Sequence, residues 1–280
     1  MRLFVVFVFV SLLSACSSKF AYDNLDWWVY WYLDDYIELN NKQEEQFDSY
    51  LQKWLSWHKQ SELTRYKAHL QQVKSQVINN EMDYDTIYAN FDMAKAHWER
   101  VRDEISPQLA ILAKELSDDQ VVQLFAALEK DNKEEEKERK EKLAETAAKR
   151  LESRIERMEE SVEERIGGLS QPQKQIIASY AQQFVSTSEE WLKYQRDIQN
   201  AARRIFVTRS TNTNFANDLT TLMQNPEQYR SDAFKQASAH NTKLTATMMA
   251  ELFTTLSAKQ KEKLVDELDE LIDTVAKFQR

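Results

Sequence analysis

The stretch that decides the fold runs from Asp118 to Ile166 and reads DDQVVQLFAALEKDNKEEEKERKEKLAETAAKRLESRIERMEESVEERI. It contains neither glycine nor proline, the residues that most often interrupt a helix. We therefore predict one continuous helix, about 70 Å long at 1.5 Å per residue. Its middle, from Glu129 to Lys142, is nearly all charged. Such a run predicts a solvated helix face, and the alternative is an arm that protrudes to contact a partner.

The composition of the whole chain extends this helical prediction. The 280 residues include only two glycines and three prolines, far fewer than turn-rich β architectures need. Apolar residues make up 42% of the chain, which is ordinary for a globular protein. We predict an all-α fold, an elongated multi-helix bundle that forms a single domain over residues 23–280.

The two glycines, Gly167 and Gly168, follow the long helix directly. A glycine just past a helix end predicts a left-handed residue there, so we expect the sharpest turn of the chain at this point. It divides the domain into two halves. Further helices are predicted over residues 42–78, 82–116 (bent at Pro107), 170–209, 215–223, 227–254 and 258–279.

Four segments share one pattern, a leucine, then serine or asparagine, two variable residues and a glutamine. They are Leu39–Gln43, Leu116–Gln120, Leu169–Gln173 and Leu256–Gln260. Serine or asparagine at an N-cap accepts a hydrogen bond from an early helical N–H, and a glutamine three residues on reaches back to the N-cap N–H. This capping box predicts the N-cap and N3 pairs Asn40 and Gln43, Ser117 and Gln120, Ser170 and Gln173, and Ser257 and Gln260.

The same pattern resembles the Leu-Thr-x-x-Gln signature of periplasmic stress chaperones of the Spy and CpxP type, which are small, cradle-shaped and helical. Here the second position is serine or asparagine, never threonine, and the chain is much longer. The resemblance implies a chaperone-like or stress-related binding protein. The alternative interpretation is four ordinary helix starts in a helical protein.

An aromatic segment precedes the first of these starts and reads LDWWVYWYLDDY from Leu25 to Tyr36. Its apolar residues recur at helical spacing and predict a helix with a wide apolar face. The candidate binding face consists of Trp27, Trp28, Trp31, Tyr32 and Tyr36. Three interpretations remain open: burial in the core, contact with a membrane surface, or a groove for unfolded chains or hydrophobic ligands.

The N-terminus has the layout of a secretory signal, with Arg2 followed by an apolar run that is too short to cross a bilayer as a helix. The run ends in Leu13-Ser14-Ala15-Cys16, which resembles the lipobox of bacterial lipoproteins. The resemblance implies that residues 1–15 are a cleaved signal peptide and that Cys16, the only cysteine, carries a diacylglycerol and an N-acyl chain. Residues 16–22 would form a lipidated tether. Ser17 in place of aspartate implies the outer membrane, with the protein facing the periplasm.

A third resemblance rests on Leu25-Asp26-Trp27, the Trp31–Tyr36 run and the helix start at Leu39–Gln43. These residues are similar to the beginning of a family of Gram-negative (proteobacterial) lipoproteins of unknown function. The resemblance implies the location and the helical architecture of nearly the whole mature chain. It implies no activity.

The net charge and the distribution of histidines argue against a nucleic-acid-binding protein and against an enzyme. The net charge is −9, and removal of residues 1–15 takes away Arg2 and leaves −10, which argues against a nucleic acid partner. The four histidines, His58, His69, His97 and His240, are scattered, and no metal, phosphate-loop or nucleophile spacing is present. We predict no catalytic residue, no metal, no cofactor and no small-molecule substrate. The chain is expected to act by binding a protein, either as a chaperone-like binder or as a structural adaptor for an envelope complex.

Overall fold

The computed structural model describes Tyr22 and residues 24–279. The predicted signal peptide and Cys16 lie outside the described residues. Within the described part of the chain every regular element is a helix, so the all-α prediction is confirmed there. The α-helices are α3 (Leu25–Asp34), α4 (Asn41–Trp57), α5 (Leu63–Ile78), α6 (Tyr84–Lys114), α7 (Asp118–Ala144), α8 (Ala147–Ile166), α9 (Gln171–Ala181), α10 (Ser188–Val207), α11 (Phe215–Gln224), α12 (Asp232–Thr254) and α13 (Ala258–Phe278).

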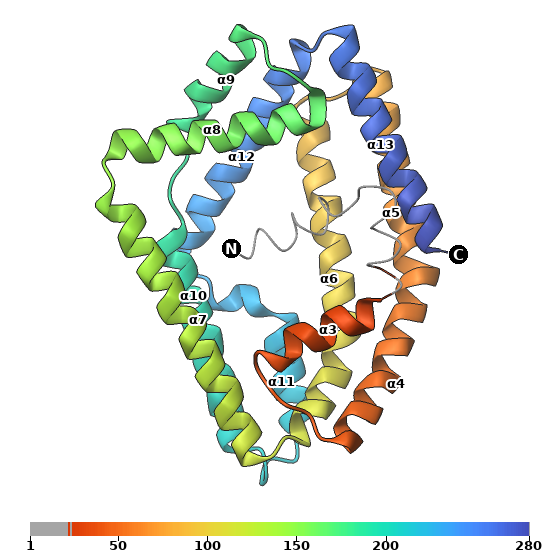
Figure 1. Cartoon of the computed structure of the whole chain (residues 1–280), viewed down its shortest axis with the longest axis vertical. Coiled ribbons are helices and arrows are strands. Elements are labelled where there is room, and N and C mark those ends of the chain that lie inside the picture. The colour runs from red at the N-terminus through yellow and green to blue at the C-terminus, as the bar shows by residue number, and fades with distance from the viewer. Residues whose placement is uncertain (1–21, 23, 280) are drawn as a thin grey trace.

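The helices are arranged as a frame of paired elements (Figure 1). On one side α13 lies along α5, and on the other side α7 lies along α10. Between them α6 packs against α4, α11 and α12, while α8 and α9 cross one end of the frame. Helices of the second half therefore pack against helices of the first half, and the two halves interlock.

The buried apolar residues follow this arrangement and form four separate clusters among the described residues. The largest is built from aromatic rings, with Phe206 in edge-to-face contact with both Phe125 and Phe215 at centroid distances of 5.5 and 5.3 Å. The others centre on Leu63 and Val275, on Val77, Phe253 and Leu268, and on Ile177, Met248 and Leu252. Each cluster joins only two to four helices, so the frame is held at its contacts rather than by one central core.

The prediction of one continuous helix over residues 118–166 is wrong, because the helix is broken at Glu145 and Thr146. Both residues are extended, and α7 and α8 meet there at a corner of the frame (Figure 1). Thr146 is the N-cap of α8, and its hydroxyl accepts a hydrogen bond from the Lys149 N–H at 3.2 Å. The Arg150 guanidinium donates to the Leu143 and Glu145 carbonyls at the end of α7. The break is thus capped on both sides.

The turn that follows α8 is made by Gly167, as predicted, but not in the predicted conformation. Its φ of 82° is positive, whereas its ψ of −170° is extended, so the residue is not left-handed helical. This region of backbone conformation is essentially restricted to glycine. The Lys263 ammonium group donates to the Glu164 carbonyl at 2.8 Å and so satisfies an acceptor at the end of α8.

The single helix predicted over residues 170–209 is also wrong, since a connection over residues 182–187 separates α9 from α10. Arg154 of α8 donates to the carbonyls of Ala181 and Phe184, at 2.8 and 2.9 Å. The Asn241 side chain exchanges two hydrogen bonds with the backbone of Val185, at 3.0 and 2.8 Å. Partners from α8 and α12 therefore replace the helical bonds that this segment lacks.

Pro107 lies inside α6 and removes one helical donor, which leaves the Asp103 carbonyl without its partner on the helix. The Gln224 amide, at the end of α11, donates to that carbonyl at 3.1 Å. This bond fastens α11 to α6 at the position where the proline would otherwise leave an unsatisfied acceptor.

The helix predicted over residues 42–78 is present but contains a π-helical turn, η1 (His58–Glu62), between α4 and α5. A π turn adds one residue to a helical turn and rotates the faces of the two flanking segments relative to each other. Glu62, the last residue of this turn, is fully buried. A buried carboxylate needs partners, and these are described below.

Candidate functional site

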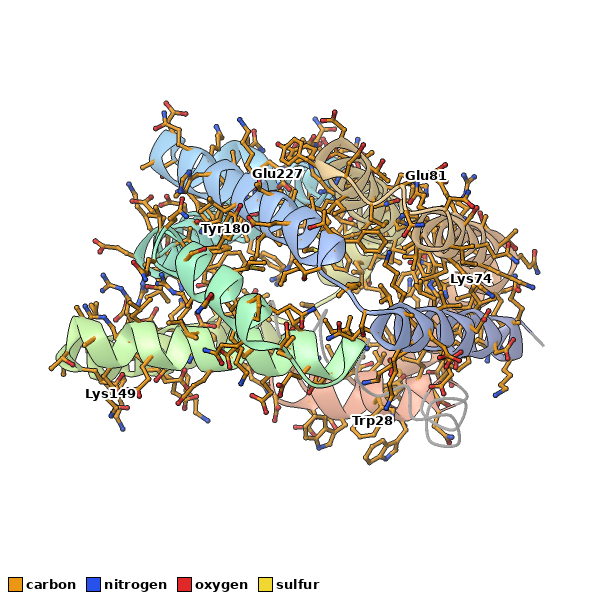
Figure 2. All side chains as sticks on the ribbon, turned by 90° about the horizontal axis from the view of Figure 1, so that it is seen from above. Trp28, Lys74, Glu81, Lys149, Tyr180 and Glu227 are labelled. Atoms are coloured by element: carbon orange, nitrogen blue, oxygen red, sulfur yellow. The ribbon has the colours of Figure 1, made fainter. Side chains whose placement is uncertain are left out.

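The aromatic helix α3 exposes four of the five residues of the predicted face. Trp27 and Trp31 are 58% and 57% exposed, and Trp28 and Tyr32 are also exposed. Trp28 makes edge-to-face contacts with Trp27 and Trp31, at centroid distances of 4.7 and 6.0 Å. Figure 2 shows Trp28 projecting away from the body of the molecule. Core burial does not account for these four side chains in the structure.

The opposite side of α3 attaches the helix to the body. Tyr30 packs edge-to-face on Phe47 of α4 at 5.4 Å, and its hydroxyl donates to the Asp48 carboxylate at 2.7 Å. Burial and this carboxylate raise the pKa of Tyr30 well above its ordinary value. Leu25 packs on the cluster around Leu63 and Val275. The orientation of α3 is therefore defined, with the tryptophans outward.

Tyr36, the fifth predicted residue, lies beyond the end of α3 and does not share the exposed face. Its hydroxyl donates to the Asp131 carboxylate of α7 at 2.6 Å, and Tyr32 donates to the Tyr36 hydroxyl at 3.3 Å. Tyr36 thus connects the aromatic segment to the charged helix. We define the aromatic face from here on as Trp27, Trp28, Trp31 and Tyr32.

The four helix starts are joined in pairs by their glutamines. Capping boxes are present at Asn40, Ser117 and Ser257, and at Ser170 the Gln173 side chain accepts from the N-cap N–H at 2.9 Å. Beyond this local role, the side-chain amides of Gln43 and Gln120 donate to each other's oxygens, at 3.0 and 2.7 Å. Gln173 and Gln260 do the same at 3.0 and 3.1 Å. We call these two contacts the glutamine junctions.

Both junctions follow one design. Each glutamine also donates to a carbonyl that lies two residues before the N-cap of its partner's helix. In the first junction these acceptors are Glu115 and Glu38, and in the second they are Thr255 and Gly168. The repeated geometry indicates that the two halves of the chain are built on the same plan. No pattern within a single segment could have predicted which starts would pair.

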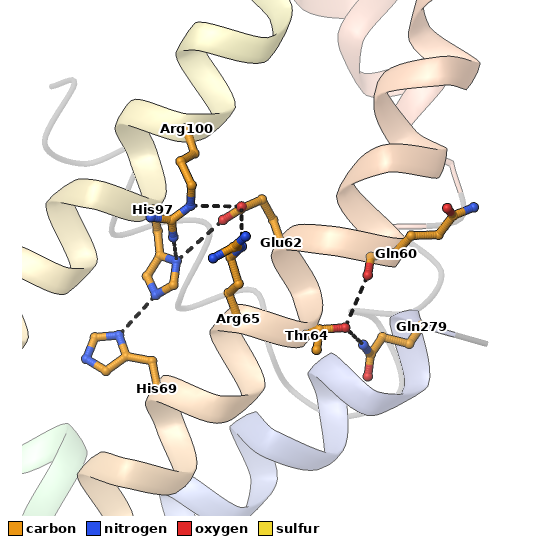
Figure 3. A network of polar contacts seen from close by, with 8 residues as sticks. All are labelled: Gln60, Glu62, Thr64, Arg65, His69, His97, Arg100 and Gln279. Atoms are coloured by element: carbon orange, nitrogen blue, oxygen red, sulfur yellow. Dashed lines mark hydrogen bonds and ion pairs between the residues drawn. The ribbon is translucent and has the colours of Figure 1, made fainter.

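A second polar centre surrounds the π turn (Figure 3). The Glu62 carboxylate accepts from Arg100 at 2.9 Å and forms an ion pair with Arg65 at 3.3 Å. Arg100 lies on α6, so the pair joins the α4–α5 segment to α6. A buried carboxylate held by two guanidinium groups is stable only while both partners remain in place.

Two histidines continue this network. His97 of α6 lies 3.2 Å from His69 of α5, and His69 lies 3.2 Å from the Asn90 side-chain oxygen. A single direction of donation satisfies three of the contacts: Arg100 donates to His97 Nδ1, His97 Nε2 donates to His69 Nδ1, and His69 Nε2 donates to Asn90. His97 Nδ1 also lies 3.5 Å from the Glu62 carboxylate, but in this arrangement it has no proton to donate there. Burial lowers the pKa of His97, in agreement with the neutral ring that this chain requires.

In the sequence these histidines are scattered, because His69 and His97 are 28 residues apart and no motif links them. The structure brings them together across two antiparallel helices. The one available signal was the acidic residue at position 62 within an otherwise amphipathic helix. Among the residues that the structure describes, no group of three or more metal-binding side chains is assembled here or elsewhere.

The charged helix α7 packs along α10. Arg196 of α10 pairs with Glu129 at 2.9 Å and Glu136 at 2.6 Å. Asn132 of α7 is buried and exchanges amide hydrogen bonds with Gln199. These contacts hold the middle of the charge run against a neighbouring helix, so this segment does not protrude as a separate arm.

Comparison with known proteins assigns the chain to a family. A family model described as "Family of unknown function (DUF6279)" matches residues 35–235, which is more than half of the chain. The chain belongs to this family. No curated protein and no solved structure matches it.

The region matched by the DUF6279 model contains some of the structural features described above and excludes others. It includes both partners of the first glutamine junction, Gln43 and Gln120, and the π-turn network. It begins at Asp35, so the aromatic face lies before it. None of the described helices is long and apolar enough to cross a membrane.

Proposed function

We propose that this DUF6279 member is a lipid-anchored lipoprotein of the outer membrane, faces the periplasm and acts by binding polypeptide in a chaperone-like manner. The Leu13–Cys16 lipobox, the apolar run before it and Ser17 after it support the anchor and the location. The function is binding rather than catalysis, and the expected partner is a protein that exposes apolar segments.

The observation that carries the chaperone-like assignment is the pairing of the four Leu-(Ser/Asn)-x-x-Gln helix starts. These starts resemble the signature of small periplasmic stress chaperones, and here they join the helices into a frame with its apolar contacts divided among four clusters. Large apolar side chains remain exposed on the helices of this frame, including Trp98, which is 59% exposed, and Ile111 on α6. We propose these exposed apolar side chains as the contacts for a client polypeptide.

The adaptor hypothesis has less support. It depended on a long charged helix that extends from the body to reach a partner. The helix is broken at Thr146, and α7 uses Glu129, Asn132 and Glu136 to bind α10. Part of the charge run is therefore engaged within the chain, and the helix does not extend as an arm.

Two experiments test the proposal. Metabolic labelling with a fatty acid should mark the wild-type chain and the Ser17→Ala control but not Cys16→Ser, and wild-type protein should fractionate with the outer membrane. An unlabelled wild-type chain would overturn the anchor.

The purified lipidated chain, held in vesicles, should suppress the light scattering of a chemically denatured client protein at stoichiometric amounts. Trp98→Ser together with Ile111→Ser should weaken the suppression, whereas Lys130→Ser, an exposed control on α7, should not. Failure of the wild-type chain to suppress aggregation would overturn the chaperone-like function while leaving the anchor in place.

A further inference from the structure

We infer that the aromatic face of α3 docks on the interfacial region of a zwitterionic phospholipid bilayer and thereby orients the frame relative to the membrane. The inference rests on the proposed lipid anchor at Cys16. It assigns to Trp27, Trp28, Trp31 and Tyr32 a partner that is not a client polypeptide but the membrane surface itself.

The first step is the geometry of the face. At 100° per residue, these four positions span an arc of about 140° on the helix. All four side chains are exposed, and Trp28 projects outward in the view of Figure 2. Tyr30, on the other side of α3, and Leu25, at the start of the helix, hold α3 on the body. A helix that presents one aromatic side outward and is attached along the other is suited to lie flat on an interface.

The second step is the reach of the chain. Leu25, the first residue of α3, lies nine positions after Cys16. Fully extended, nine residues span about 30 Å at most. If Cys16 carries lipid, α3 is therefore confined to within about 30 Å of the bilayer surface, closer than any other described helix is required to be.

The third step is the chemistry of the face. Tryptophan and tyrosine favour the membrane interface, because their rings are apolar and their N–H and O–H groups still reach polar partners. The charged residues within α3 and directly after it, Asp26, Asp34 and Asp35, are all acidic, and the net charge of the chain is −9. Anionic lipid headgroups would be repelled. The face therefore fits a zwitterionic surface.

The test uses the full lipidated chain in phosphatidylcholine vesicles. Because Cys16 is the only cysteine and its thiol would be consumed by the lipid, one engineered cysteine can be labelled uniquely. Tyr32→Cys places an environment-sensitive fluorophore on the face, and Val207→Cys, at a residue that is 79% exposed on α10, is the matched control. The fluorophore at position 32 should shift to shorter wavelength and lose at least about half of its emission with brominated phosphatidylcholine, whereas that at 207 should do neither.

Three results would overturn the inference. A fluorophore at position 32 that stays in water means that the face does not dock. One that is shielded from water but not quenched by brominated lipid means that a second copy or a polypeptide covers the face. Quenching that persists when Trp27, Trp28 and Trp31 are all changed to serine means that the tether, not the aromatic face, brings α3 to the lipid.

Failure of the anchor gives a different readout. If Cys16 carries no lipid, the wild-type chain does not float with vesicles and its Cys16 thiol reacts with maleimide, which overturns the proposed location together with the docking. If the chain floats but position 32 reports water, the anchor stands and only the docking is overturned. Trp98→Ser, which removes an equally exposed tryptophan from α6, should leave the quenching at position 32 unchanged.

Discussion

Gln43 and Gln120 lie 77 residues apart in sequence, and their side-chain amides donate to each other. Each also accepts from the N-cap N–H at the start of its own helix and donates to a carbonyl before the partner's helix. The amide groups of both side chains are thereby satisfied at a point where two helix starts meet. Such a junction stabilises the meeting of two chain segments more specifically than apolar contact alone.

We expect Gln43→Ala to lower the free energy of unfolding by about 1–3 kcal/mol, because it leaves buried donors and acceptors of the junction without partners. Denaturant unfolding followed by circular dichroism measures the change. Gln71→Ala, at an exposed position within α5, is the control and should change the free energy by less than about 0.5 kcal/mol. In a double-mutant cycle, Gln43→Ala with Gln120→Ala should cost less than the sum of the single changes. Additive costs would contradict the direct pairing.

Glu62→Gln tests the network at the π turn. It removes the buried charge that Arg100 and Arg65 share, and the neutral amide cannot replace two ion pairs. Breaking a buried pair in this way costs about 3 kcal/mol, toward the lower end of the usual range because Arg100 is partly exposed. Glu81→Gln, at an exposed position, should have little effect. A thermal midpoint equal to that of wild type would show that the pair contributes nothing.

The same network predicts a dependence of stability on pH. Burial lowers the pKa of His97 in the folded state, and burial also lowers that of His58. The unfolded chain therefore binds protons more readily as the pH falls below about 6.5, the ordinary histidine pKa. The contribution of these two neutral histidines to the free energy of unfolding should be fully present above about pH 6.5. It should be lost as the pH falls from there through the lowered pKa values of the folded state. His97→Gln should reduce the slope of the thermal midpoint against pH between about 7 and 5, and an unchanged slope would argue against the assignment.

Gly167 and Gly168 form a matched pair of sites. Gly167→Ala places a side chain on a backbone with φ 82° and ψ −170°, and we expect it to cost about 1–3 kcal/mol. The added Cβ itself meets only the Lys263 Cδ atom at 3.6 Å, an ordinary contact, so the cost is one of backbone conformation. Gly168→Ala meets no atom within 4 Å and should be neutral or stabilising by up to about 1 kcal/mol. Urea unfolding of both variants measures the change in the free energy of unfolding. Equal changes at the two sites would contradict the structure.

The helix starts could be predicted because their signal is local. Asn40, Ser117, Ser170 and Ser257 each stand three residues before a glutamine, and all four begin helices in the structure. Thr146 also begins a helix, but Lys149 follows it in place of a glutamine or glutamate, so the capping box is incomplete. In a run with no glycine or proline, that single N-cap was too weak a signal to predict the break.

The connection between α9 and α10 could not be predicted, because what stabilises it is distant in sequence. Asn241 and Arg154 bind the backbone of residues 181–185. The local sequence of the connection gives no sign of either partner. The same holds for His69 and His97, which meet only because α5 packs on α6. Tertiary contacts, rather than helix propensity, determine both features.

The sequence predicted the residues of the aromatic face, but it did not predict which side of the helix would face outward. Apolar residues occupy both sides of the Leu25–Leu33 segment, so the pattern did not indicate which side would pack on the body. Tyr30 decides this through its bond to Asp48, a residue of another helix. Tyr36 leaves the set for the same reason, because Asp131 of α7 binds its hydroxyl.

The positions of the two glutamine junctions bear on how the chain acquires its structure as it emerges N-terminus first. The first junction needs nothing beyond Gln120, and the second needs nothing before Gly168. Each lies wholly on its own side of Gly167. The leading segment can therefore form its own junction before the trailing segment is available. The packing of α10 on α7, of α9 and α13 on α8, and of α11, α12 and α13 on α5 and α6 has to wait for the trailing segment. If the chain is exported unfolded, as the proposed signal peptide requires, its first half need not stay unfolded until its second half arrives.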